Sequence, residues 1–299
     1  MKTTVSPSDI RTVVTKEDDF GHEMRVGHII RSVPAIRLEH GGTYTDSVTQ
    51  KPRQFDFRCS LTKETNFNSK NRTARLSLAV ECKNLSPSVP LIVCGNRRSG
   101  DEAFHDIIES RNGRVERGSA IISGLSSVTR RASREHTIYP PGEFVGKSLV
   151  RVQTDKDPMV RTPDSDIYDK WAQALSSAVG LVESACGSAK GVPGSRFFTT
   201  VLPLVVVPDG LLWRVIYDDS GSIPAEPEQV KECELYVSRE IEVGGKKGTP
   251  LFHCFTFSHV HFFTLTGFSS FLSKMAVNEH AWKQLFTENP LEMTLDTGL

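Results

Sequence analysis

The chain alternates between segments whose apolar residues recur with helical spacing and shorter apolar segments that are typical of strands. Residues 17–32 carry Phe20, Met24, Gly27 and Ile30 at helical spacing, acidic residues in the first turn, and a proline two residues beyond the end. These features predict a first helix with one side facing a sheet.

Strand-like segments follow this helix. Three of them, each bounded by polar or turn-forming residues, lie at 43–48, 55–61 and 76–83. A fourth, apolar segment at 90–95 predicts a buried strand. The region beyond it is polar and contains several glycines, and we predict within it only a short helix at 104–109.

The second half of the chain repeats this alternation. A second helix is predicted from residue 164, because apolar side chains form one stripe along it. The stripe consists of Ile167, Trp171, Leu175, Ala178 and Val182. Further apolar segments predict two strands around a turn at 208–210, a hairpin with its turn at 244–250, a final strand at 260–267 and a last helix near 279–286.

Helices and strands in this order indicate an α/β fold, with α+β as the alternative, in which a mixed sheet is flanked by helices. We expect residues 1–150 to form the core, including an arginine-rich connector. Residues 151–299 would then add a helix and β-hairpins that complete or cover the sheet as a β-rich extension. A single continuous domain is the alternative organisation.

Composition and charge narrow the class of protein. The 299 residues are 38% hydrophobic and 24% charged, which is typical of a globular chain and not of a disordered one. The formal net charge is zero, so a nucleic acid would have to bind at a local patch. Because no apolar segment has the length of a membrane span or the pattern of a signal peptide, we expect a cytoplasmic protein without a membrane partner. Six isolated cysteines predict reduced thiols.

Strand alternation places charged residues of two predicted strands on one side of the sheet. Opposite the apolar face, residues 55–61 present Asp56, and residues 76–83 present Glu81 and Lys83. Two carboxylates on neighbouring strands suit Mg²⁺, which binds a few carboxylates together with water and substrate phosphate. Lys83 would orient or deprotonate the attacking water and balance charge on the phosphoryl oxygens. The pattern therefore predicts metal-dependent hydrolysis of a phosphodiester.

These residues also carry a resemblance. The sequence FDF, followed by an apolar strand that ends in VECKN, resembles the PD-(D/E)XK nuclease superfamily of restriction-endonuclease-like proteins, over roughly residues 15–97. The resemblance implies a core of one helix, three antiparallel strands, a crossover helix and a further strand. It implies catalytic roles for Asp56, Glu81 and Lys83, and an additional acid from the first helix, for which Glu23 fits best. Other candidates for this acid are Glu17, Asp18, Asp19 and Glu39.

The same resemblance implies Mg²⁺ as the cofactor, with Mn²⁺ able to substitute, and Asp56, Glu81 and Glu23 as its ligands. It implies DNA as the substrate and a setting in restriction or defence against foreign DNA. The sequence leaves open whether an ATP-driven translocase or further copies of the chain act as partners. The connector after Lys83 is too short for the crossover helix. Either the strand at 90–95 is an additional one, or the helix follows later, near Phe104.

Two alternatives compete with the nuclease interpretation. An Asp opposite a Glu-x-Lys pair on a half-exposed sheet also forms an ordinary cross-strand salt bridge. The same fold without turnover would serve as a module that binds nucleic acid or protein.

Two further groups of residues carry weaker signals. Clustered arginines indicate either a solvated loop or a surface that contacts phosphates. The arginines chosen as candidates for nucleic-acid binding are Arg97, Arg98, Arg130, Arg131 and Arg134. His259 and His261 face one side of a strand, near His253 and Cys254, as zinc ligands can, although alternating histidines among aromatic residues more often belong to a packed strand.

Overall fold

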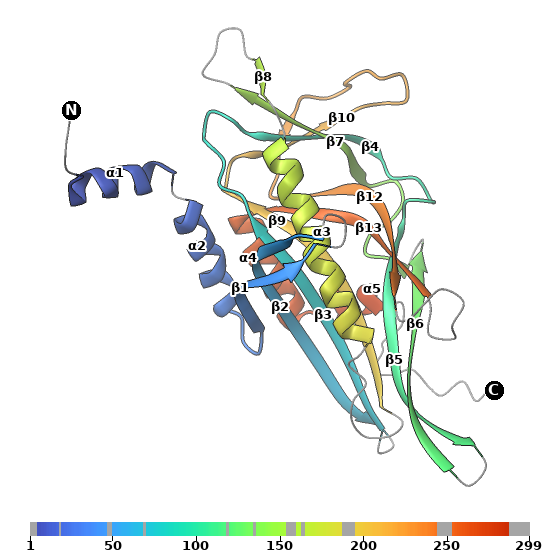
Figure 1. Ribbon diagram of the computed structural model, residues 1–299. Coiled ribbons are helices and arrows are strands. Elements are labelled where there is room, and N and C mark those ends of the chain that lie inside the picture. The colour runs from blue at the N-terminus through green and yellow to red at the C-terminus, as the bar shows by residue number, and fades with distance from the viewer. Residues whose placement is uncertain are drawn as a thin grey trace.

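The chain forms a mixed α/β fold, seen here in a computed structural model (Figure 1). The structure describes residues 5–17, 19–46, 50–67, 70–117, 120–133, 136–153, 160–162, 165–186, 195–243 and 253–286. Within these ranges, thirteen strands form one mixed sheet, and five helices accompany it. No helix in the described ranges is both long and apolar enough to cross a membrane.

The first third of the chain builds one side of the sheet. Helix α1 (Pro7–Glu17) precedes α2 (Asp19–Arg31), and three strands then form an antiparallel meander. The strands are β1 (Arg37–Thr45), β2 (Pro52–Phe67) and β3 (Lys70–Cys82).

A long segment of five strands separates this meander from the next helix. Its strands are β4 (Leu91–Arg97), β5 (Phe104–Arg117), β6 (Ala120–Ser133), β7 (Phe144–Gln153) and β8 (Val160–Thr162). Helix α3 (Ser165–Cys186) then leads into β9 (Arg196–Val207), which pairs with β3 in parallel. The β3-to-β9 connection is therefore a crossover that contains α3, as a parallel pair requires.

The remaining elements complete the sheet and cover one face of it. They are β10 (Leu212–Ile216), β11 (Glu228–Gln229), β12 (Glu232–Val243), β13 (His253–Thr264), α4 (Leu265–Val277) and α5 (Glu279–Phe286). The main strand order is β1-β2-β3-β9-β13-β12-β7-β4-β10-β11, and the β5–β6 hairpin branches from β9. Strands from before and after residue 150 thus share one sheet.

Helices pack on both faces of the sheet and enclose two apolar cores. One core joins Val26 and Ile30 of α2 with α4, α5 and the apolar face of β2 and β3. The other lies under α3, where Ile167 and Ala178 meet the opposite face of the sheet. Figure 1 shows α3 lying across the face of the β1–β3 meander. Strand β9 is buried on both faces for most of its length, as its apolar sequence VLPLVVV predicts.

Strand alternation decides which residues of β3 face which core. Leu76, Leu78 and Val80 belong to the core that contains α2, and Ala79 belongs to the core under α3. Glu81 therefore lies on the α3 side. This is the division predicted for the strand from its sequence.

Several predicted elements are confirmed, and others are wrong. The meander, the helix α3, the β12–β13 hairpin and the helix α5 are present, while residues 244–250 of the hairpin turn lie outside the described residues. Strand β1 spans Arg37–Thr45 and not 43–48, and the predicted final strand at 260–267 is the end of β13 followed by the start of α4 at Leu265. Residues 104–109 are strand and not helix, because β5 pairs with both β6 and β9. The strands on either side of the turn at 208–210 do not pair with each other, since β10 pairs in parallel with β4.

The first helix also differs from its prediction. Residues 7–17 and 19–31 form two helices, and Phe20 and Met24 are 64% and 40% exposed. The buried face of α2 consists instead of His22, Val26, Gly27 and Ile30. At Gly27 a Cβ atom would lie 3.0 Å from the Phe57 ring, so the glycine allows a close approach of α2 to β2. The close packing of α2 on β2 at Gly27 therefore determines which face of α2 is buried.

Candidate active site on β2, β3 and α3

Asp56 and Glu81 lie side by side on the face of the sheet that α3 covers. The register, in which Phe57 pairs with Val80, places Asp56 of β2 opposite Glu81 of β3. The backbone N–H of Cys82 donates to Asp56 Oδ2 at 2.7 Å. The pairing of the two strands therefore fixes the position of both carboxylates.

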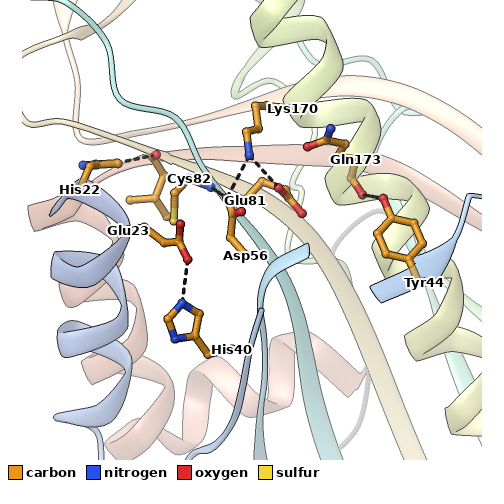
Figure 2. Close-up of polar contacts among 10 residues, drawn as sticks. His22, Glu23, His40, Tyr44, Asp56, Glu81, Cys82, Lys170 and Gln173 are labelled. Carbon is orange, nitrogen blue, oxygen red and sulfur yellow. Dashed lines mark hydrogen bonds and ion pairs between the residues drawn. The ribbon is translucent and has the colours of Figure 1, made fainter. Parts of the chain in front are cut away.

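A lysine from α3 bridges the two carboxylates (Figure 2). Lys170 Nζ donates to Asp56 Oδ2 at 3.1 Å and to Glu81 Oε2 at 3.2 Å. The exposed fractions of the side chains are 17% for Asp56, 0% for Glu81 and 25% for Lys170. The three side chains thus form a cluster that is open to solvent on the Asp56 and Lys170 side and closed around Glu81.

Sequence reasoning missed Lys170, although a signal for it exists. Lys170 lies three residues after Ile167 and four before Ala174, both of which are buried on the face of α3 that packs on the sheet. It therefore interrupts the helix face that packs on the sheet. A lysine at such a position has to reach an acidic partner or water, because a buried ammonium without a partner is costly.

Burial and neighbouring charges perturb the acid–base properties of this cluster. Burial, and then the charge of Asp56, raise the pKa of Glu81 from 4.5 to about 8, against the opposing charge of Lys170. Burial acts to lower the pKa of Lys170, but the charges of Glu81 and Asp56 outweigh it and raise that pKa. Glu81 Oε1 is buried and has no hydrogen-bond partner among the described residues. A carboxylate with one oxygen left open in this way is suited to a cation.

Lys83 and Glu23 occupy positions next to this cluster. Lys83 follows the end of β3, is half-buried, and donates its backbone N–H to the Val206 carbonyl at 2.9 Å. Glu23 Oε1 of α2 lies 2.7 Å from His40 Nε2, and Figure 2 shows the Glu23 carboxylate directed at the His40 ring. The lysine that bridges Asp56 and Glu81 is therefore Lys170, whereas the sequence predicted Lys83 beside them.

Asp56, Glu23 and Glu81 all lie close enough to the Cys82 thiol to affect its pKa. Burial, followed by the charges of Asp56, Glu23 and Glu81, raises this pKa well above its ordinary value. Nevertheless, within the described ranges no three His, Cys, Asp or Glu side chains gather closely enough to hold a metal ion. Asp56 and Glu81 alone offer a two-carboxylate site of the kind that Mg²⁺ shares with water and substrate oxygens.

The predicted phosphate-contacting arginines are dispersed. Arg98 is 3% exposed and donates to the Pro140 and Phe144 carbonyls and to Glu234, so its guanidinium has a structural role. Arg97 is exposed, and Arg134 lies outside the described residues.

Arg130 and Arg131 are tied to buried acids of the β5–β6 hairpin. Arg130 pairs with Glu109, and Arg131 pairs with Asp106, while about half of each arginine side chain stays exposed, 50% and 52%. Glu109 and Asp106 are themselves 0% and 3% exposed. These pairs offset much of the positive charge that the sequence suggested for this region.

The two histidines considered for zinc are packed side chains. Tyr139 stacks on His259 with the ring centroids 3.8 Å apart, and its hydroxyl bonds His261 Nε2 at 2.6 Å. Burial, and then the charge of Arg98, lower the pKa values of His259 to about 2 and of His261 to about 3. Both rings are therefore neutral and serve the core, while the side chain of His253 lies outside the described residues.

Comparison with known proteins adds no assignment to this geometry. The chain matches no protein-family model, no curated protein and no solved structure.

Proposed function

We propose that this chain is a metal-dependent nuclease that hydrolyses DNA phosphodiester bonds at the cluster of Asp56 and Glu81. The observation that carries the proposal is the pair of adjacent carboxylates with Glu81 Oε1 left open beside them. An ion bound by both carboxylates would supply Oε1 with a partner.

The order of elements supports the same proposal. Helix α2, the antiparallel meander β1–β3, the helix α3 and the parallel strand β9 follow the order that the PD-(D/E)XK resemblance implies. The short connector after Lys83 agrees with this order once β4–β8 are treated as an insertion ahead of α3. Asp56 and Glu81 then lie on the second and third strands of the core.

The residues present fit a divalent cation with two carboxylate ligands. When bound, Mg²⁺ or Mn²⁺ would polarise the scissile phosphate and lower the pKa of a coordinated water. Asp56 and Glu81 would hold the ion, and Glu81 would release its proton to do so, because metal ligands bind deprotonated. Lys170 would leave the carboxylates and neutralise charge on the phosphate oxygens. Lys83 remains the candidate for orienting the attacking water.

The experiment is a cleavage assay on plasmid, linear and single-stranded DNA, with Mg²⁺, Mn²⁺ or EDTA. Cleavage that requires the metal and is lost in Asp56→Ala and Glu81→Ala is expected. Glu226→Gln, a change on an exposed loop, is the matched control and should keep wild-type activity. Equal cleavage by wild type and Glu81→Ala in preparations free of contaminating nucleases would contradict the proposal.

A second candidate function follows from the bridge itself. Lys170 holds both carboxylates, so the cluster also satisfies the requirements of a non-catalytic module that binds nucleic acid or protein. Binding of DNA without turnover under every metal condition would favour this candidate.

A further inference from the structure

A basic cavity lies on the same face of the sheet, farther along β2 and β3 from the carboxylates. Its volume is about 240 Å³, and its polar walls come from the β1–β3 meander and from the C-terminal half of α3. Three arginines line it against a single glutamate, and serines supply hydroxyl groups. These polar residues are Arg37, Arg58, Arg75, Glu39, Ser60, Ser77 and Ser184.

The register of the meander explains why these side chains converge. Arg37 of β1 pairs with Ser60 of β2, and Ser60 pairs with Ser77 of β3, so the three side chains form one row across the strands. Arg75 lies two residues from Ser77 on the same face of β3. Two hydroxyl groups are therefore flanked by a guanidinium on either side.

Arg58 is fixed in place as part of this cavity. Its Nε donates to Ser177 Oγ at 3.1 Å and its Nη2 donates to the Ser177 carbonyl at 2.9 Å. Its guanidinium carbon lies 4.4 Å from the centre of the Phe55 ring. At Gly180 a Cβ would approach Nη2 to 3.0 Å, so the glycine makes room for this arginine beneath α3. The remaining N–H groups of Arg58 bond no residue in the described part of the chain.

The arginines are close enough to repel one another. Burial, and then the charge of Arg37, lower the pKa of Arg75, while Glu64 opposes the shift. The side chain of Arg37 makes no hydrogen bond or ion pair with any described residue. Glu39, Glu64 and Glu183 offset part of this positive charge, and an anion in the cavity would offset more of it.

We propose that this cavity binds a phosphate monoester, with the guanidinium groups of Arg37, Arg58 and Arg75 and the hydroxyl groups of Ser60 and Ser77 as donors. Arginine forks match phosphate oxygens, and a dianion would balance the excess of positive charge. Binding here requires neither metal nor cleavage.

The position of the cavity links it to the candidate active site. Arg58 lies two residues from Asp56 and Ser77 lies four from Glu81, which correspond to about 7 and 13 Å along a strand. A DNA strand would have to extend over these separations to reach both places. The cavity would thus hold the terminal phosphate of a strand whose scissile bond lies at Asp56 and Glu81. This link rests on the proposed nuclease function, whereas the phosphate site itself does not.

The test measures binding in EDTA, where no cleavage can occur. Calorimetry with inorganic phosphate, and fluorescence anisotropy with single strands that carry a 5′-phosphate, a 3′-phosphate or only hydroxyl ends, distinguish a free ester from a strand end. Arg37→Ala and Arg75→Ala should each weaken phosphate binding by about 10-fold or more. Arg11→Ala removes the same charge from exposed α1 and should bind like wild type.

The outcomes separate the two proposals. Phosphate binding that is lost in the Arg37 and Arg75 variants supports the site even if the protein cleaves no DNA. A tighter complex with the phosphorylated strand supports the link to a strand end, and equal affinity for phosphorylated and hydroxyl strands overturns that link. Equal affinity of wild type and both variants for phosphate, in proteins that unfold at the same urea concentration, overturns the site.

Discussion

Replacing Glu81 by Gln should stabilise the protein at pH 8 and leave it nearly unchanged at pH 5. Glu81 is 0% exposed, and its pKa in the folded protein is about 8, against 4.5 ordinarily. Between these two values the folded protein keeps a proton that the unfolded chain releases. The free energy of unfolding therefore falls as the pH rises from about 4.5 to about 8, and it is highest, for this group, below 4.5.

The magnitude follows from the same two pKa values. Each unit of difference corresponds to about 1.4 kcal/mol, so the carboxyl group of Glu81 costs the wild type about 4 to 5 kcal/mol of stability at pH 8. At pH 5 it costs less than about 1 kcal/mol. The amide of Gln has no proton to lose, and it can still accept a hydrogen bond from Lys170. The difference in stability between Glu81→Gln and wild type should therefore grow by about 3 to 4 kcal/mol between pH 5 and pH 8.

Urea unfolding, followed by tryptophan fluorescence at pH 5, 6, 7 and 8, measures this difference directly. Glu226→Gln makes the same chemical change on an exposed loop, and its curve should run parallel to that of the wild type. If the free energies of unfolding of Glu81→Gln and wild type also change in parallel over this pH range, Glu81 is ionised in the folded protein, because Lys170 stabilises its charge. The assignment of a protonated, buried carboxyl group would then be refuted.

Three further outcomes are expected. Mg²⁺ should raise the melting temperature of the wild type more at pH 8 than at pH 6, because the ion competes with the proton on Glu81. The ion should have little effect on the melting temperature of Glu81→Gln. Scanning calorimetry with Mg²⁺ and with EDTA measures both melting temperatures. On the proposed nuclease function, Lys170→Ala should lower DNA cleavage by about 10²-fold in a gel assay, because a group proposed to neutralise phosphate charge is lost. Unchanged cleavage would leave Lys83 as the candidate lysine. Tyr139→Phe should lower the free energy of unfolding by about 1 to 3 kcal/mol, because His261 Nε2 loses its buried partner, and equal urea midpoints would contradict this role.

Local pattern was sufficient to predict the part of the fold that carries the carboxylates. Alternation in β2 and β3 identifies the apolar face, and a shift of one residue would have moved Asp56 and Glu81 into the core. The stripe on α3 likewise follows from the sequence, because a helix on a sheet has to bury one side. These predictions depend only on neighbours within a few residues.

The other features depend on contacts between distant segments. Residues 104–109 form a strand because β9, which begins only at Arg196, pairs with them, and no local preference reports this. Lys170 is separated from Glu81 by 89 residues and approaches it only when α3 crosses the sheet. The pairing of β10 with β4 likewise joins strands that are separated in the chain by β5–β9 and α3. The sequence pattern therefore predicts the apolar face of each helix and strand, whereas the topology of the whole chain decides which of these faces pack together.

The perturbed pKa of Glu81 and its open oxygen together argue against a purely structural role for the cluster. A salt bridge that served only stability would gain from Gln at position 81, which avoids the cost of ionisation and can still accept from Lys170 Nζ. The chain instead keeps a carboxyl group that lowers stability at neutral pH and leaves Oε1 without a partner among the described residues. Such a cost is typical of sites where a charged ligand supplies the missing interaction. A cation bound by Asp56 and Glu81 would remove both penalties at once, since it favours the ionised form of Glu81 and satisfies Oε1.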